Sequence, residues 1–172
     1  TWAAQSNQAA AVKTLLELSA NPLNPDAKGK YPLTYAIENG AVESTNAILT
    51  SIAKDYGANV SRGHATEALK YGASGGKVAV CEVLIEHGAN PHQMYDGREC
   101  TETPLSLAVQ SGDTKTVELF IKQKAIPDAG DLERCIIHNN TELFKLLLAN
   151  GADPKSLEGT EKIMGGLGIL SG

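Results

Sequence analysis

The stretch TPLSLAVQSGDTKTVELFIKQKA, residues 103–125, contains a Thr-Pro start, a run of small and apolar residues, a Gly-Asp break and a second apolar run. The same order of features recurs in YPLTYAIENGAVESTNAIL, residues 31–49. Each copy has the pattern of two short helices joined by a turn. Because self-similarity of this kind is the signature of repeat architectures, the two copies predict an array of helix-turn-helix units.

Alignment on the break between the paired helices extends the pattern to five units, and a second helix is expected after each break. This helix carries apolar residues at i, i+3 and i+4, a spacing that places all three side chains on one face. The residues at the break are Asn7, Gly40, Gly76, Gly112 and Asn139. The triplets are Val12/Leu15/Leu16, Thr45/Ile48/Leu49, Cys81/Leu84/Ile85, Val117/Phe120/Ile121 and Phe144/Leu147/Leu148.

The ends of the second helices carry the related motifs SANP, GANV, GANP and GADP. Gly57, Gly88 and Gly151 are predicted to cap these helices in the left-handed conformation. The helix before each break is built on small residues, which predicts close approach between neighbouring inner helices.

These motifs resemble the ankyrin repeat, whose consensus has a TPLHxAxxxG first helix and a GAdpn exit. The best matches are DAKGKYPLTYAIENG and TPLSLAVQSGD, and the resemblance covers residues 1–154. It implies an all-α solenoid of helix-turn-helix units with short β-hairpin-like connections. The expected repeats span approximately 1–25, 26–61, 62–97, 98–127 and 128–154. Residues 155–172 are interpreted as a C-terminal half repeat or cap, with a frayed Gly-rich tail as the alternative.

Several features depart from the family pattern. Thr34, Lys70, Ser106 and Glu133 replace the consensus His of the first helix. The second unit has the extra residues SIAKDY before Gly57, and the fifth passes from Pro127 almost directly into its inner helix. The first unit starts partway through its inner helix, so we expect that an upstream hairpin is missing or was removed.

Composition narrows the classes of partner. The net charge of −5 and the absence of a basic run disfavour nucleic acid. No apolar run approaches the ~20 residues that span a bilayer. Three cysteines without close spacing favour a reduced, cytoplasmic compartment, with secretion into a host cell or a processed N-terminus as alternatives. We expect a monomer in the absence of a partner.

No catalytic, cofactor or metal site is predicted. The four histidines lie in different units, and none stands beside an acid and a nucleophile in a recognisable pattern. His87, His92 and Cys100 imitate metal-ligand spacing, but no CxxC or HExxH motif accompanies them. YGASGGK lacks the full GxxxxGK[ST] pattern of a phosphate loop.

The resemblance implies a partner-binding surface made of hairpin tips and the free face of the inner helices. The repeat pattern predicts that the loop HQMYDGRECTE projects Met94 and Tyr95 into solvent beside Arg98. Tyr and Arg are enriched in interface hot spots, so this loop is a candidate contact with the partner. The alternative is that Tyr95 folds back on its own hairpin. The candidate partner-binding residues are Lys28, Lys30, Glu38, Asn39, His64, Met94, Tyr95, Arg98, Glu102, Gln110, Ser111, Ile137 and His138.

Aromatic residues also recur at one inner-helix position, in the series Trp2, Tyr35, Tyr71 and Leu107. A stacking platform is one interpretation, but packing at the edge of the core is favoured, since the family places a leucine there. The function expected from the resemblance is a noncatalytic protein-protein interaction scaffold, acting as an adaptor, an inhibitor or a bacterial host-directed effector. The alternative is a regulatory or targeting segment of a larger enzyme whose catalytic domain is not in this chain.

Overall fold

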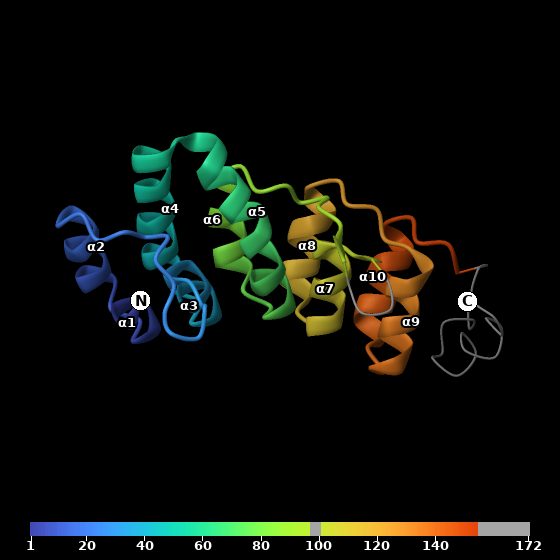
Figure 1. The fold of residues 1–172 in the computed structure, drawn as a ribbon. Helices are drawn as coiled ribbons and strands as arrows, with labels where there is room; N and C mark the ends of the chain where they lie inside the picture. The colour runs from blue at the N-terminus through green and yellow to red at the C-terminus, as the bar shows by residue number, and fades with distance from the viewer. Residues whose placement is uncertain (97–100, 155–172) are drawn as a thin grey trace.

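The computed structural model describes residues 1–96 and 101–154 of the chain. These residues form ten helices, which follow one another as five pairs in a single row (Figure 1). The helices are α1 (Trp2–Gln5), α2 (Ala9–Glu17), α3 (Pro32–Glu38), α4 (Val42–Tyr56), α5 (Ala58–Ser74), α6 (Val78–Glu86), α7 (Pro104–Ser111), α8 (Thr114–Lys122), α9 (Ala129–Ile137) and α10 (Thr141–Ala149). The short strands β1 (Tyr95–Asp96) and β2 (Thr101–Glu102) pair antiparallel. The predicted all-α solenoid is confirmed.

Each pair turns at a residue with positive φ. The φ values are 53° at Asn7, 66° at Gly40, 60° at Gly76, 77° at Gly112 and 52° at Asn139. In all five turns the backbone N–H of this residue donates to the carbonyl three residues earlier, at 2.9 to 3.2 Å. The residues that the sequence aligns at the break therefore share one left-handed helix-ending geometry.

The helices stack in two layers over one continuous core. Inner helices α1, α3, α5, α7 and α9 pack against one another, as do outer helices α2, α4, α6 and α8. A small inner residue also lets the two helices of one pair approach closely: a Cβ on Gly72 of α5 would lie 2.9 Å from the Sγ of Cys81 on α6. The predicted triplets contribute to the core except for Leu15, which is 44% exposed. Leu15 lies on α2, at the end of the described row, so no described helix covers its far side (Figure 1).

The connection between the second and third pairs departs from the predicted pattern. Only Gly57, with φ 94° and ψ 156°, separates α4 from the 17-residue α5. The extra residues SIAKDY extend α4 to Tyr56, and one of them, Ile52, is fully buried in the core. The hydroxyl of Ser61 donates to the Leu49 carbonyl at 3.0 Å and ties α5 to α4. The repeat pattern places His64 at the hairpin tip of the third unit. In the structure His64 lies within α5, so that expectation is wrong.

The structure also corrects the predicted exposure of Tyr95. This side chain is 8% exposed and belongs to the core. Its hydroxyl donates to the Thr66 carbonyl of α5 at 2.6 Å, and burial raises the pKa of the phenol. β1 thus anchors the hairpin to α5 through Tyr95, whereas its neighbour Met94 is 63% exposed. Arg98 and the expected half repeat at 155–172 lie outside the described residues.

No helix in residues 1–96 and 101–154 is both long and apolar enough to cross a bilayer.

Thr45 provides a test of the core. Its hydroxyl is buried without a hydrogen-bond partner, at a triplet position where other units carry Val, Cys or Phe. Because an unsatisfied buried hydroxyl is unfavourable, we expect Thr45→Val to raise the free energy of unfolding by about 1 kcal/mol. Urea denaturation measures this change. Thr116→Val is the matched control, since the equally buried Thr116 hydroxyl donates to Asp113 at 2.6 Å, and it should destabilise. Equal destabilisation by both changes would contradict the assignment of the Thr45 hydroxyl as a buried group without a hydrogen-bond partner.

The anchoring role of Tyr95 is tested by two substitutions. Tyr95→Phe removes the hydrogen bond to the Thr66 carbonyl and should lower the free energy of unfolding by about 1 kcal/mol. Tyr95→Ala also empties the packed site and should lower it by about 3 kcal/mol or more. Tyr71→Phe, at a 41% exposed side chain, should stay within about 0.5 kcal/mol of the parent. A Tyr95→Ala protein as stable as the parent would show that the ring is not part of the core.

Candidate functional site

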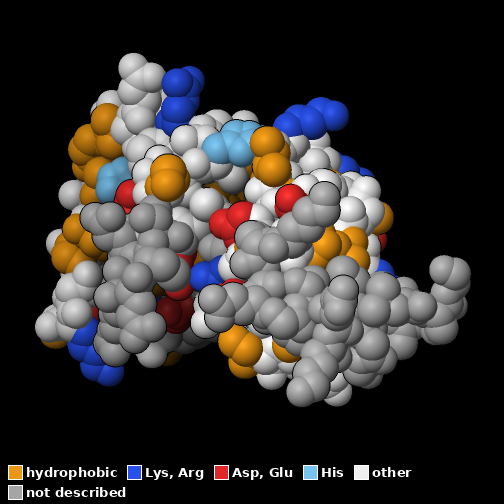
Figure 2. Space-filling model, turned by 90° about the vertical axis from the view of Figure 1, so that its right-hand side faces the viewer, with side chains coloured by type: hydrophobic (Ala, Val, Ile, Leu, Met, Phe, Trp, Pro, Cys, Tyr) orange, Lys and Arg blue, Asp and Glu red, His pale blue; other side chains and the backbone are white. Residues whose placement is uncertain are grey.

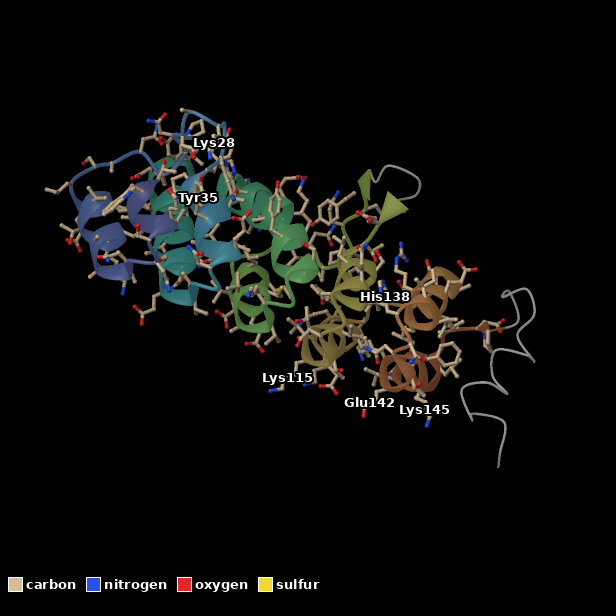
Figure 3. All side chains as sticks on the ribbon, turned by 90° about the horizontal axis from the view of Figure 1, so that it is seen from below. Lys28, Tyr35, Lys115, His138, Glu142 and Lys145 are labelled. Atoms are coloured by element: carbon tan, nitrogen blue, oxygen red, sulfur yellow. The ribbon has the colours of Figure 1, made fainter. Side chains whose placement is uncertain are left out.

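The exposed side of the inner helices, together with the loops that overhang it, forms the candidate site. We call this surface the inner face; it comprises α1, α3, α5, α7 and α9, loop residues 20–31 and the β1–β2 hairpin. Figure 3 shows Lys28 and Tyr35 on this side of the molecule and Lys115, Glu142 and Lys145 of the outer helices on the opposite side. Figure 2 views the molecule from the α9–α10 end of the row. In this view several Asp and Glu side chains lie near the middle, and most Lys and Arg side chains lie at the periphery.

The loop at residues 26–30 is held over α3 by Asp26. Its carboxylate accepts the backbone N–H groups of Lys28 at 2.8 Å and Lys30 at 3.0 Å, and the Tyr35 hydroxyl at 2.7 Å. The Tyr35 hydrogen bond, with those from the backbone, lowers the pKa of Asp26, and the pKa of Tyr35 is raised by the same carboxylate. Lys30 pairs with Glu38 and lies 4.3 Å from the centre of the Tyr35 ring. Lys28 is thereby presented at the exposed tip.

Asn39 and Ser111 make hydrogen bonds within the array. The Asn39 amide donates to the carbonyls of Ala4 at 3.1 Å and Gln5 at 2.9 Å, which joins the first pair to the second. The Ser111 hydroxyl donates to the Ala108 carbonyl at 2.7 Å. Both side chains therefore have structural roles in addition to their position on the inner face.

The middle of the inner face is hollowed on both sides of α5. A cavity of about 310 Å³ lies toward loop 20–31, and a second of about 590 Å³ lies toward the β1–β2 hairpin. Both are lined by Glu67, Lys70 and Tyr71. We call the two cavities together the α5 notch. Because Gly57 joins α4 directly to α5, no hairpin lies between loop 20–31 and β1–β2.

Aromatic and charged side chains meet in the α5 notch. The Lys70 Nζ lies 3.3 Å from a Glu67 carboxylate oxygen and 5.3 and 5.7 Å from the ring centres of Tyr71 and Tyr95. On the other side, the rings of Tyr31 and His64 are 6.4 Å apart and tilted by 58°. Tyr31 and Tyr71 are 42% and 41% exposed, so apolar ring surface remains open to a partner.

The structure brings only some of the candidate partner-binding residues together. His64, Met94, Tyr95 and Glu102 line the α5 notch. Lys28, Lys30 and Glu38 gather at the loop over α3. The exposed Gln110, Ile137 and His138 lie at the ends of α7 and α9, outside the residues that line the notch.

Tyr31, Glu67 and Lys70 are components of the site that were not expected from the sequence, and Tyr71 was interpreted there as packing at the edge of the core. The expected packing of the aromatic series is also wrong in part. Trp2 is 74% exposed and Tyr71 41%, whereas Leu107, five residues before its break like the others, is 7% exposed. The recurrence of aromatic residues at one inner-helix position was the signal for Tyr71, but packing was favoured over an exposed platform.

Chemically, the described residues favour recognition. They contain no group of three or more His, Cys, Asp or Glu side chains that could hold a metal ion. Burial raises the pKa of the Cys81 thiol to about 12 and that of Cys135 to about 11, so both stay protonated at neutral pH and neither is an activated nucleophile. His87 faces the outer helices, 2.7 Å from the Asn46 side-chain oxygen, and burial lowers its pKa.

Comparisons with known proteins identify the family of this chain. A family model described as ankyrin repeats (3 copies) matches residues 1–95 and 69–158. Over 108 residues the chain is 30% identical to the human transient receptor potential cation channel subfamily A member 1, an alignment that covers 60% of this chain and 9% of that protein. The fold is similar to the human ASB11 ankyrin repeat domain, with a TM-score of 0.70 and 22% identity, over 88% of this chain and 68% of that domain. The chain belongs to the ankyrin-repeat family.

Proposed function

We propose that this chain is a noncatalytic scaffold that binds another protein through its inner face. The observation that carries the proposal is the α5 notch, where exposed Tyr31, Tyr71 and Met94 surround charged side chains. Tyr and Met are enriched at protein interfaces, and repeat solenoids use extended faces of this kind for binding. Ankyrin repeats are in general protein-protein interaction modules, which supports the same function.

The proposed binding residues are exposed or partly exposed members of the inner face. Lys28, His64, Met94 and Glu102 would contact the partner near the α5 notch and its flanking loop, with Lys30 and Glu38 beside them. Gln110, Ile137 and His138 would extend the contact toward α9. Asn39, Ser111 and Tyr95 would act by holding these elements in place, since their polar groups bond within the array. In this proposal the chain is a monomer until it binds.

The scaffold could act as an adaptor, an inhibitor or a host-directed effector. The alternative is a regulatory or targeting segment of a larger enzyme whose catalytic domain is not in this chain. One observation bears on its premise that the chain is part of a longer protein. The human channel relative is aligned over only 9% of its length, so in that protein the similar segment is a small part of a much longer chain.

The test compares the two faces in affinity capture from native lysate. The inner-face variant combines Trp2→Ala, Tyr71→Ala and Ile137→Ala. The matched outer-face variant combines Lys115→Ala, Glu142→Ala and Lys145→Ala, which are also exposed. Proteins captured by the parent should be retained by the outer-face variant and reduced at least tenfold by the inner-face variant, because buried interface aromatics commonly contribute 2 kcal/mol or more.

Melting curves establish that both variants remain folded. Capture that survives the inner-face changes and is lost with the outer-face changes would refute the proposal.

A further inference from the structure

We propose that the α5 notch binds an extended segment of the partner that carries a large apolar side chain and, two residues away, a Lys or Arg. This inference rests on the proposed function and specifies the chemistry that the inner face recognises. It is carried by the different character of the two cavities, which share the α5 residues Glu67, Lys70 and Tyr71 as their floor.

The cavity toward loop 20–31 accepts the apolar side chain. Its walls include Pro22, Leu23, Tyr31 and Leu33, and Tyr71 lines both this cavity and the one toward the hairpin. At about 310 Å³ it lies at the lower end of the range for ligand cavities, so it suits one large side chain. The half-exposed rings of Tyr31 and Tyr71 are the surfaces that such a side chain would cover.

The cavity toward the β1–β2 hairpin selects a positive charge. Among the described residues, two carboxylates, Glu67 and Glu102, line it together with one cation, Lys70. The Lys70 ammonium already lies 3.3 Å from Glu67 and faces the rings of Tyr71 and Tyr95. Glu102 is partly buried and has no ion-pair partner among the described residues. The charge that remains to be matched is therefore negative, and a guanidinium or ammonium group satisfies it.

The arrangement of the two cavities sets the spacing between the apolar and the basic residue of the bound segment. Tyr71 lines both cavities, so the two side chains that occupy them must be near neighbours in the sequence of the bound segment. In an extended chain, side chains at i and i+2 point to the same side. A basic side chain over Glu102 would also lie beside the Tyr71 ring, which favours a cation. The net charge of −5 adds a longer-range attraction for a basic segment.

The experiment selects binding peptides from a phage-displayed library of random 12-residue peptides against the immobilised full chain. Enriched peptides are then synthesised and their affinities measured by fluorescence anisotropy. We expect enrichment of an aromatic or large aliphatic residue two positions from Lys or Arg, in either order. Affinity should fall at least tenfold with Tyr71→Ala and with Glu102→Gln, and Glu142→Gln on the outer face should leave it unchanged.

Charge reversal provides the second arm. Peptides in which Glu replaces the basic residue should bind Glu102→Lys at least tenfold more tightly than they bind the parent. This gain cannot result from a loss of folding.

The inference is overturned if no peptide is enriched, if enriched peptides lack the basic residue, or if Glu102→Gln and Tyr71→Ala leave their affinities unchanged. The experiment distinguishes rejection of the α5 notch as the binding site from rejection of the proposed function. Peptides that depend on Trp2 or Ile137 but not on Glu102 would reject the notch and keep the inner face. Peptides that depend only on Lys115, Glu142 or Lys145 would reject both.

Discussion

A left-handed residue at the end of each inner helix is the constraint on which the array depends. Its positive φ reverses the chain, and its N–H satisfies a carbonyl that the helix end leaves open. Repetition of this one turn gives successive pairs the same form, so they can stack over a continuous core. At Gly76 the turn also touches the next pair, because a Cβ there would lie 2.9 Å from the Cβ of Asp113.

The proposed site arises at a place where the repeat is not kept. Regular turns position α3, α5 and α7 side by side, but at Gly57 a hairpin is replaced by a direct helix-to-helix junction. Between loop 20–31 and the β1–β2 strands no further hairpin in the described part of the chain lies over α5 (Figure 1). Its residues Glu67, Lys70 and Tyr71 line the two cavities there. In this account, regularity provides the stability of the array and the interruption provides its recognition surface.

The fold could be predicted from the sequence because its decisive chemistry is local: Gly or Asn at a left-handed turn, and apolar triplets at helical spacing. The site could be predicted only in part. Gly57 was expected to end α4 beside a hairpin, yet glycine also permits the conformation that starts α5. The burial of Tyr95 depends on Thr66, 29 residues away in sequence. Tyr71 and Leu107 occupy equivalent positions, and their different exposure is decided by neighbouring elements.

The most direct test of the central claim measures the free energy of unfolding of two Gly→Ala variants by urea denaturation. Gly76→Ala places a side chain at φ +60° and against Asp113, and should destabilise by more than about 1 kcal/mol. Gly63→Ala lies in the exposed interior of α5 with open space around its Cβ, and should stabilise by up to about 1 kcal/mol because Ala favours helix. Opposite signs are the predicted result. A Gly76→Ala protein at least as stable as the parent would contradict the claim that this left-handed turn organises the array.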